Sequence, residues 1–144
     1  MGVTISGLEE VRQDLKTATD TIVNQTRGVV ARGSLNIKDD ARDLIAGHVG
    51  RYGGVYITSY PRSIGYDVTI DGTVVSSEIG PDKSLPQGPL GNILEYGSIN
   101  NGPIPHLNPA LDREEQPFAD NLEALGGDLL EGKGVRSDGS PDHG

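Results

Sequence analysis

A helical periodicity running through the first third of the chain constrains the fold more than any other feature. Apolar and small side chains recur there in steps of three and four, at Leu8, Val11, Leu15, Ala18, Ile22, Thr26, Val29, Val30, Gly33, Ile37, Ala41, Leu44, Ile45 and His48. This spacing places them on one face of an α-helix. Gly28 and Gly33 each weaken a helix by about 1 kcal/mol relative to Ala. The sequence therefore predicts either one long helix or two helices with a break near residues 19–20 or 33–34, ending near residues 47–50 where Gly can accept a left-handed cap.

The region after this helix is predicted to be β structure. Residues 55–60 are rich in β-branched and aromatic side chains, and Pro61 should end that strand or mark it as an edge. Residues 66–70 and 73–79 flank the dipeptide Asp71-Gly72, which is a strong signal for a two-residue hairpin loop. We therefore expect a β-hairpin at 66–79.

Such a turn sets the pairing of the hairpin. It places Val68 opposite Val75 and Ile70 opposite Thr73. One face of the hairpin is then apolar, formed by Tyr66, Val68, Ile70, Val75 and Ile79. Because an isolated hairpin is only marginally stable, this face should pack against the long helix.

The last part of the chain predicts a loop, a turn and a second helix. A loop over residues 80–89 leads into a short helical turn at residues 93–96, which Gly97 stops. Asn108 can cap a helix whose first residue is Pro109. Pro117 should kink or restart that helix. The helix face is carried by Leu111, Phe118, Leu122, Leu125 and Leu129.

These elements predict an α+β fold with a long N-terminal helix, continuous or broken, packed on a small antiparallel sheet, plus a C-terminal helix. We expect a single domain over residues 1–131 and a flexible C-terminal tail over residues 132–144 that orders only against a neighbour. The chain has one Phe, one Met and no Trp, against 21 Gly and 9 Pro. The core should therefore be small, and neighbouring subunits could supply the missing burial.

The charge and the absent sequence patterns restrict the classes of partner. The net charge of −9 argues against a protein that binds duplex DNA, although an acidic surface could line a channel through which DNA passes without sticking. Simple solubility explains the same charge. The chain contains no Cys, so disulfides and thiolate metal sites are excluded. No apolar run approaches the roughly 20 residues that span a bilayer, and no signal peptide is evident, so no membrane partner is expected.

No motif for catalysis or cofactor binding is present. Neither the nucleophile elbow nor the phosphate-binding loop patterns occur, and the histidines, His48, His106 and His143, have no metal-type spacing. The adjacent carboxylates Asp39-Asp40 and Glu114-Glu115 should be solvated helix surface. We therefore expect no enzyme, no cofactor and no metal. His106, between two prolines, is the one histidine with an unusual setting.

Two short segments carry a resemblance to a known family. They are Ile93-Leu94-Glu95-Tyr96-Gly97-Ser98 and Pro103-Ile104-Pro105-His106-Leu107-Asn108-Pro109-Ala110-Leu111-Asp112. Together they resemble the siphophage family of tail-completion or head–tail joining proteins, also called neck or minor tail proteins. The order of elements over residues 5–130 is similar to that family as well. His106 stands where the family usually has Phe, and residues 50–54 depart from the family's usual stretch between helix and hairpin.

The resemblance implies a structural virion protein of the phage neck. It implies a ring of six subunits that joins the head connector or stopper proteins to the tail terminator or tail tube protein, with DNA passing through the lumen without specific binding. The protein would then be found at the neck of the virion, and in the host cytoplasm during assembly. Because a proline-stiffened loop loses little entropy on ordering, the candidate interface residues are Glu95, Tyr96, Gly97, Pro103, Pro105, His106 and Pro109.

Three alternatives remain open from the sequence. A tail terminator ring is the same kind of object with a different neighbour. A small regulatory binding module is a different class. A metal-dependent hydrolase would use His106 with Asp112 or Glu95.

Overall fold

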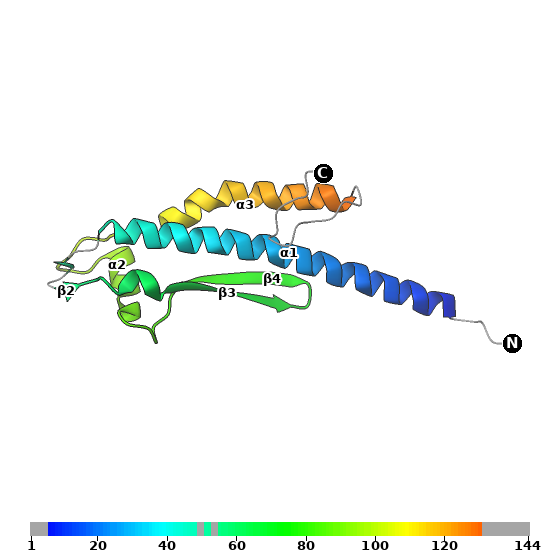
Figure 1. Ribbon diagram of the computed structural model, residues 1–144, viewed down its shortest axis with the longest axis horizontal. Coiled ribbons are helices and arrows are strands. Elements are labelled where there is room, and N and C mark those ends of the chain that lie inside the picture. Colours follow the sequence, from blue (N-terminus) through cyan, green and yellow to red (C-terminus); the bar gives the residue numbers. More distant parts are fainter. Residues whose placement is uncertain (1–5, 49–50, 53–54, 131–144) are drawn as a thin grey trace.

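The computed structural model describes residues 6–48, 51–52 and 55–130. A long helix, α1 (Ser6–Ala46), lies in the middle of the fold. The hairpin of β3 (Ile64–Asp71) and β4 (Val74–Pro81) packs on one side of α1, and helix α3 (Leu107–Leu130) packs on the other (Figure 1). The expected α+β fold is confirmed. The predicted tail at 132–144 lies outside the described residues.

Helix α1 is continuous, so the alternative with a break at residues 19–20 or 33–34 is wrong. Gly33 has a packing role that outweighs its low helix propensity. A Cβ at this position would lie 3.0 Å from Cδ2 of Phe118, which means that Gly33 lets α3 approach α1 closely. His48 follows the C-terminal end of α1. It is exposed, and its Nδ1 lies 3.1 Å from the carbonyl oxygen of Leu44, so it caps.

The two halves of α1 lie in different surroundings. Buried side chains occur from Val29 to Ile45. By contrast, all residues from 7 to 22 are exposed, and this segment extends beyond both the hairpin and α3 (Figure 1). We call residues 7–22 the projecting segment. Among the described residues, no helix combines the length and the apolar character that crossing a bilayer requires.

The hairpin forms where it was predicted, with a different pairing. Ile70 pairs with Val75 and Val68 with Ser77, because Asp71 pairs with Val74 and the loop consists of Gly72 and Thr73. Of these two loop residues only Gly72 has a positive φ, +63°, which is the pattern of a type II′ turn. The expected pairing of Ile70 with Thr73 is therefore wrong.

The predicted apolar face of the hairpin survives this change of pairing. Moving the partner by two residues keeps every side chain on the same side of the sheet. That face packs on α1, where the hydroxyl oxygens of Ser34 and Ser77 lie 2.6 Å apart. Ile70, near the turn, remains exposed.

The strand predicted at residues 55–60 is mostly absent. Only β2 (Val55–Tyr56) forms, paired with β1 (Arg51–Tyr52), and a 3-10 helix, η1 (Tyr60–Ser63), follows. The cause is Gln87. Its Oε1 accepts hydrogen bonds from the backbone N–H groups of Ser59 and Tyr60 at 2.9 and 3.0 Å, and its Nε2 donates to the carbonyl of Tyr56 at 2.6 Å. The N–H groups of Ser59 and Tyr60 are thus not free to join a sheet.

The remaining elements bring the chain back to the end of α1. A 3-10 turn, η2 (Gly88–Leu90), leads into α2 (Gly91–Tyr96), which Gly97 ends as predicted. Helix α3 begins at Leu107, so the expected start at Pro109 with an Asn108 cap is wrong. Pro117 lies inside α3, which continues past it without restarting.

The buried core is small and lies at the C-terminal end of α1. It joins residues of α1, the turn around η1, α2 and the start of α3: Ile37, Ala41, Ile45, Ile57, Tyr60, Ile64, Leu94 and Ala110. Arg42 of α1 links to this region by donating from Nε and Nη2 to the carbonyl oxygen of Ile64 at 3.0 and 2.6 Å. The core therefore fixes the turn that contains Glu95.

Candidate functional site

The turn formed by α2 and the residues after it is the region that the sequence analysis singled out. We call residues 91–108 the Glu95 bend. Its backbone closes on itself: the N–H of Gly97 donates to the carbonyl of Ile93 at 2.7 Å, and the N–H of Ile104 donates to the carbonyl of Leu94 at 2.6 Å. Gly97 has a φ of +83°, and a Cβ there would lie 3.0 Å from the backbone nitrogen of Pro103. Glycine is thus required at this point both by conformation and by space.

Glu95 caps α3 from a distant place in the sequence. Its side chain is buried, and its Oε1 accepts hydrogen bonds from the backbone N–H groups of His106 and Leu107 at 3.0 and 2.7 Å. Its Oε2 accepts from the N–H of Asn108 at 3.3 Å. The first N–H bonded within the helix is that of Ala110, which donates to the carbonyl of His106 at 3.3 Å.

This arrangement accounts for the whole N-terminus of α3. The first four N–H positions of a helix lack intrahelical partners. Here they are His106, Leu107, Asn108 and Pro109. Glu95 accepts from the first three, and Pro109 has no N–H to satisfy. The carboxylate also lies at the positive end of the helix dipole, where a negative charge is stabilised.

His106 is enclosed beside this carboxylate. It is 0% exposed, and its Nε2 lies 2.7 Å from the hydroxyl of Tyr60. Its Nδ1 lies 2.9 Å from the carbonyl oxygen of Ile104 and 3.2 Å from Oε1 of Glu95. Both neighbours of Nδ1 are acceptors, so the partners require a proton on Nδ1. Nε2 then accepts from the Tyr60 hydroxyl, whose pKa is raised by burial and, secondly, by the charge of Glu95.

The candidate interface residues divide into an internal and an external group. Glu95 and His106 are buried and act inside the subunit. Gly97 and Pro109 are partly buried. The exposed members are Tyr96, Pro103 and Pro105, and the neighbouring Ile99 is fully exposed. Contacts with another molecule at this bend would therefore involve the exposed group, which the buried group holds in position.

The buried cluster offers limited room for chemistry. A chain from Tyr60 through His106 to Glu95 is similar in connectivity to a relay of acid and base groups, yet a substrate has no route to the enclosed imidazole ring in this conformation. Asp112, the other residue weighed for a hydrolase, is exposed on α3. Among the described residues, no group of three or more His, Asp or Glu side chains is arranged to hold a metal ion.

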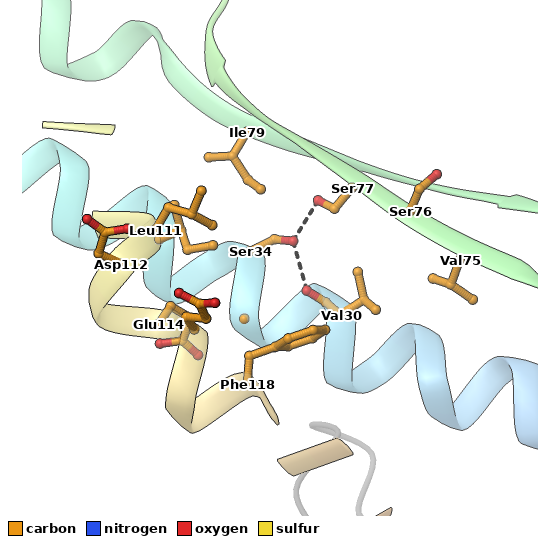
Figure 2. A pocket seen from close by; sticks show the side chains of 13 residues that line it. Val30, Ser34, Val75, Ser76, Ser77, Ile79, Leu111, Asp112, Glu114 and Phe118 are labelled. Carbon is orange, nitrogen blue, oxygen red and sulfur yellow. Dashed lines mark hydrogen bonds between the residues drawn. The ribbon is translucent and has the colours of Figure 1, made fainter. Parts of the chain in front are cut away.

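The structure also contains an apolar groove that sequence reasoning missed. It lies between α1, β4 and α3 and has a volume of about 420 Å³ (Figure 2). Its apolar lining consists of Val30, Ile37, Val75, Ile79, Leu111 and Phe118. Ser34 crosses its floor, donating to the carbonyl of Val30 at 2.8 Å and contacting Ser77 (Figure 2). No signal in the sequence showed that three distant elements would leave this space uncovered.

The two adjacent carboxylates on α3 do not share one environment. Glu115 is exposed, as predicted. Glu114 is buried at the α1–α3 contact, where its Oε1 accepts a hydrogen bond from Nδ2 of Asn36 at 3.1 Å. The expectation that both are solvated is thus wrong for Glu114, because successive helix residues face different sides and Glu114 faces α1.

Comparison of the chain with protein-family models, curated proteins and solved structures finds no match.

Proposed function

We propose that this protein is a non-enzymatic structural subunit of a bacteriophage neck, one copy in a ring that joins the head connector to the tail. Two lines of support come together here. One is the resemblance of residues 90–112 to the tail-completion and head–tail joining family. The other is the way in which the chain exposes its apolar side chains.

The observation that carries the proposal is that exposed apolar side chains lie on two distant parts of the molecule. Tyr96 and Ile99 are exposed at the Glu95 bend, while Leu8 and Leu15 are exposed on the projecting segment. A ring is built from heterologous contacts, in which one surface of each copy meets a different surface of the next. A subunit with two separate apolar surfaces is suited to such contacts. Because its core is small, contacts with neighbouring subunits can add to its stability.

The internal bonds of the Glu95 bend give the proposal a physical rationale. A loop held by a buried carboxylate, a left-handed glycine and prolines loses little entropy when it meets a partner. Repeated identical contacts around a ring favour a pre-organised loop of this type. The net charge of −9 is compatible with a lumen that DNA crosses without binding.

The proposal is tested by locating the protein in assembled particles. Purified virions should contain it, and images of the particles should place it at the neck in several copies, with six as the expected number. Cross-linking to the connector proteins rather than only to the tube protein would separate the head–tail joining role from that of a tail terminator. Absence of the protein from finished virions would refute the proposal.

A further inference from the structure

The projecting segment carries an apolar stripe along one side. Leu8, Val11, Leu15 and Ile22 are 70%, 53%, 64% and 45% exposed. Their spacing of three, four and seven residues places them in line along the helix. In proteins most helical stability comes from packing of an amphipathic face, and the apolar face of this segment packs on none of the other residues that the structure describes. A surface that covers the stripe would therefore stabilise the segment as well as remove apolar area from water.

The groove between α1, β4 and α3 has complementary dimensions. Along α1 it extends from Val30 to Ile37, which is about 10.5 Å at 1.5 Å per residue. Leu8 and Leu15 are also seven residues apart, so they span the same length of about 10.5 Å with Val11 between them. One helix can thus place these three side chains in the groove, in the way amphipathic helices dock in apolar grooves.

The continuity of α1 determines which copy provides the helix. The stripe and the floor of the groove belong to one unbroken helix, Ser6–Ala46, so the projecting segment cannot fold back on its own groove. Charge favours a second copy of this chain. Arg12 and Lys16 lie beside the stripe, and the α3 wall of the groove carries the exposed carboxylates Asp112 and Glu115.

The charged side chains beside the stripe are available for such a contact. In the isolated chain Arg12 pairs with Glu9 at 2.9 Å, and Lys16 pairs with Asp20 at 3.2 Å. Both pairs are exposed, and exposed pairs contribute little to stability. Glu9 and Asp20 lie further round the helix on the same flank as the basic groups, and Asp14 lies on the opposite flank. The flank that carries Arg12 and Lys16 is therefore the one that would face the acidic wall.

We propose that the projecting segment of one copy docks in the α1–β4–α3 groove of the next copy. Each copy then gives one stripe and receives one, which is a head-to-tail contact that closes into a ring or extends into an open chain according to the rotation per subunit. The ring setting of this inference rests on the proposed function, whereas the contact itself follows from the stripe and the groove.

The test uses one variant for each side of the contact. Leu15→Lys places a charge in the stripe, and Leu111→Lys places one in the groove wall. Both side chains are more than half exposed in the single chain, so both variants should fold, as checked by circular dichroism. Gln13→Lys and Gln116→Lys are the matched controls, because they add the same charge at exposed positions on the opposite sides of the same helices.

Sedimentation velocity over a range of concentrations gives the oligomeric state. The wild-type chain and both controls should form species larger than a monomer. Leu15→Lys and Leu111→Lys should each be monomeric, with the dissociation constant raised about tenfold or more. A mixture of the two should form dimers and nothing larger, because the intact groove of Leu15→Lys can receive the intact stripe of Leu111→Lys only once.

Other results would overturn the inference. A monomeric wild-type chain, association retained in Leu15→Lys, or a mixture that fails to dimerise would each do so. Loss of association in Leu15→Lys but not in Leu111→Lys would show that stripes meet each other instead of the groove. Docking by a protein that is missing from virions would leave this inference standing and remove the proposed function, so the two failures are distinguishable.

Discussion

Of the single substitutions at the Glu95 bend, the one that removes the carboxylate of Glu95 should destabilise the folded chain most. In Glu95→Ala the backbone N–H groups of His106, Leu107 and Asn108 lose their acceptor. Asn108 is exposed and can bind water, whereas His106 is fully enclosed and Leu107 is half-buried. An unsatisfied buried donor costs about 1–3 kcal/mol, so these two N–H groups predict a loss of about 2–6 kcal/mol.

Glu95→Gln separates the charge from the hydrogen bond. The amide oxygen can still accept from the helix N-terminus, but the bonds become those of a neutral acceptor. Hydrogen bonds to charged groups contribute about 1.5–3 kcal/mol and neutral ones about 0.5–1.5 kcal/mol, so the two bonds to Oε1 together predict a loss of about 2–3 kcal/mol. The favourable interaction of the charge with the helix dipole is lost as well. The order of stability should be wild type, then Glu95→Gln, then Glu95→Ala.

Urea unfolding followed by circular dichroism measures these losses. The midpoint should fall while the slope stays constant, since the surface exposed on unfolding changes little. Glu115→Ala is the control, because this exposed carboxylate on α3 should change stability by no more than about 0.5 kcal/mol. Equal stability of Glu95→Ala and Glu115→Ala would refute the conclusion that Glu95 caps α3.

Three further predictions concern the neighbouring contacts. The pKa of the Tyr60 hydroxyl is raised in the folded chain, so the stability that this group contributes is complete below the unfolded pKa of about 10 and is lost as the pH rises above it. Between about pH 9.5 and 11, Tyr60→Phe should therefore lose less stability than the wild type in urea unfolding. Curves of stability against pH that run parallel for the two proteins would contradict this. His106→Phe leaves the buried Tyr60 hydroxyl without its acceptor and should cost about 1–3 kcal/mol of stability. The double variant with Tyr60→Phe should lose less stability than the sum of the two single variants. Additive losses in this double-mutant cycle would show that the two side chains are not coupled through the 2.7 Å contact. Gly33→Ala should stabilise a Phe118→Ala background by up to about 1 kcal/mol through helix propensity and should stabilise the wild type less, because there the new Cβ meets the Phe118 ring; an equal effect in both backgrounds, measured by thermal unfolding, would exclude that contact.

The sequence by itself determined the elements that depend on local chemistry. The spacing of apolar residues predicts α1, the Asp71-Gly72 dipeptide predicts the hairpin, and Gly97 predicts the end of α2. The apolar face of the hairpin was also predictable, because side-chain alternation is fixed by the strand itself. The pairing within the hairpin was not, since Asp71-Gly72 and Gly72-Thr73 can each form a two-residue loop and both pairings leave the same side chains on each face.

Tertiary structure decided the features that depend on residues distant in sequence. Gln87 prevents a strand at residues 57–60, Glu95 moves the start of α3 to Leu107, and Phe118 explains Gly33. Each of these side chains bonds to or packs against residues that are more than ten positions away in the sequence. Periodicity and turn signals describe only neighbours along the chain, so they contain no information about such partners.

The candidate site shows the same division. The sequence drew attention to residues 93–112, but it could not show that Glu95 and His106 face inward while Tyr96 faces outward. Nor could it reveal the groove, whose walls come from α1, β4 and α3. Periodicity assigned the stripe of Leu8, Val11 and Leu15 to a helix face, and only the packed structure determined that this part of the face is left exposed, because the hairpin and α3 end before they reach it (Figure 1).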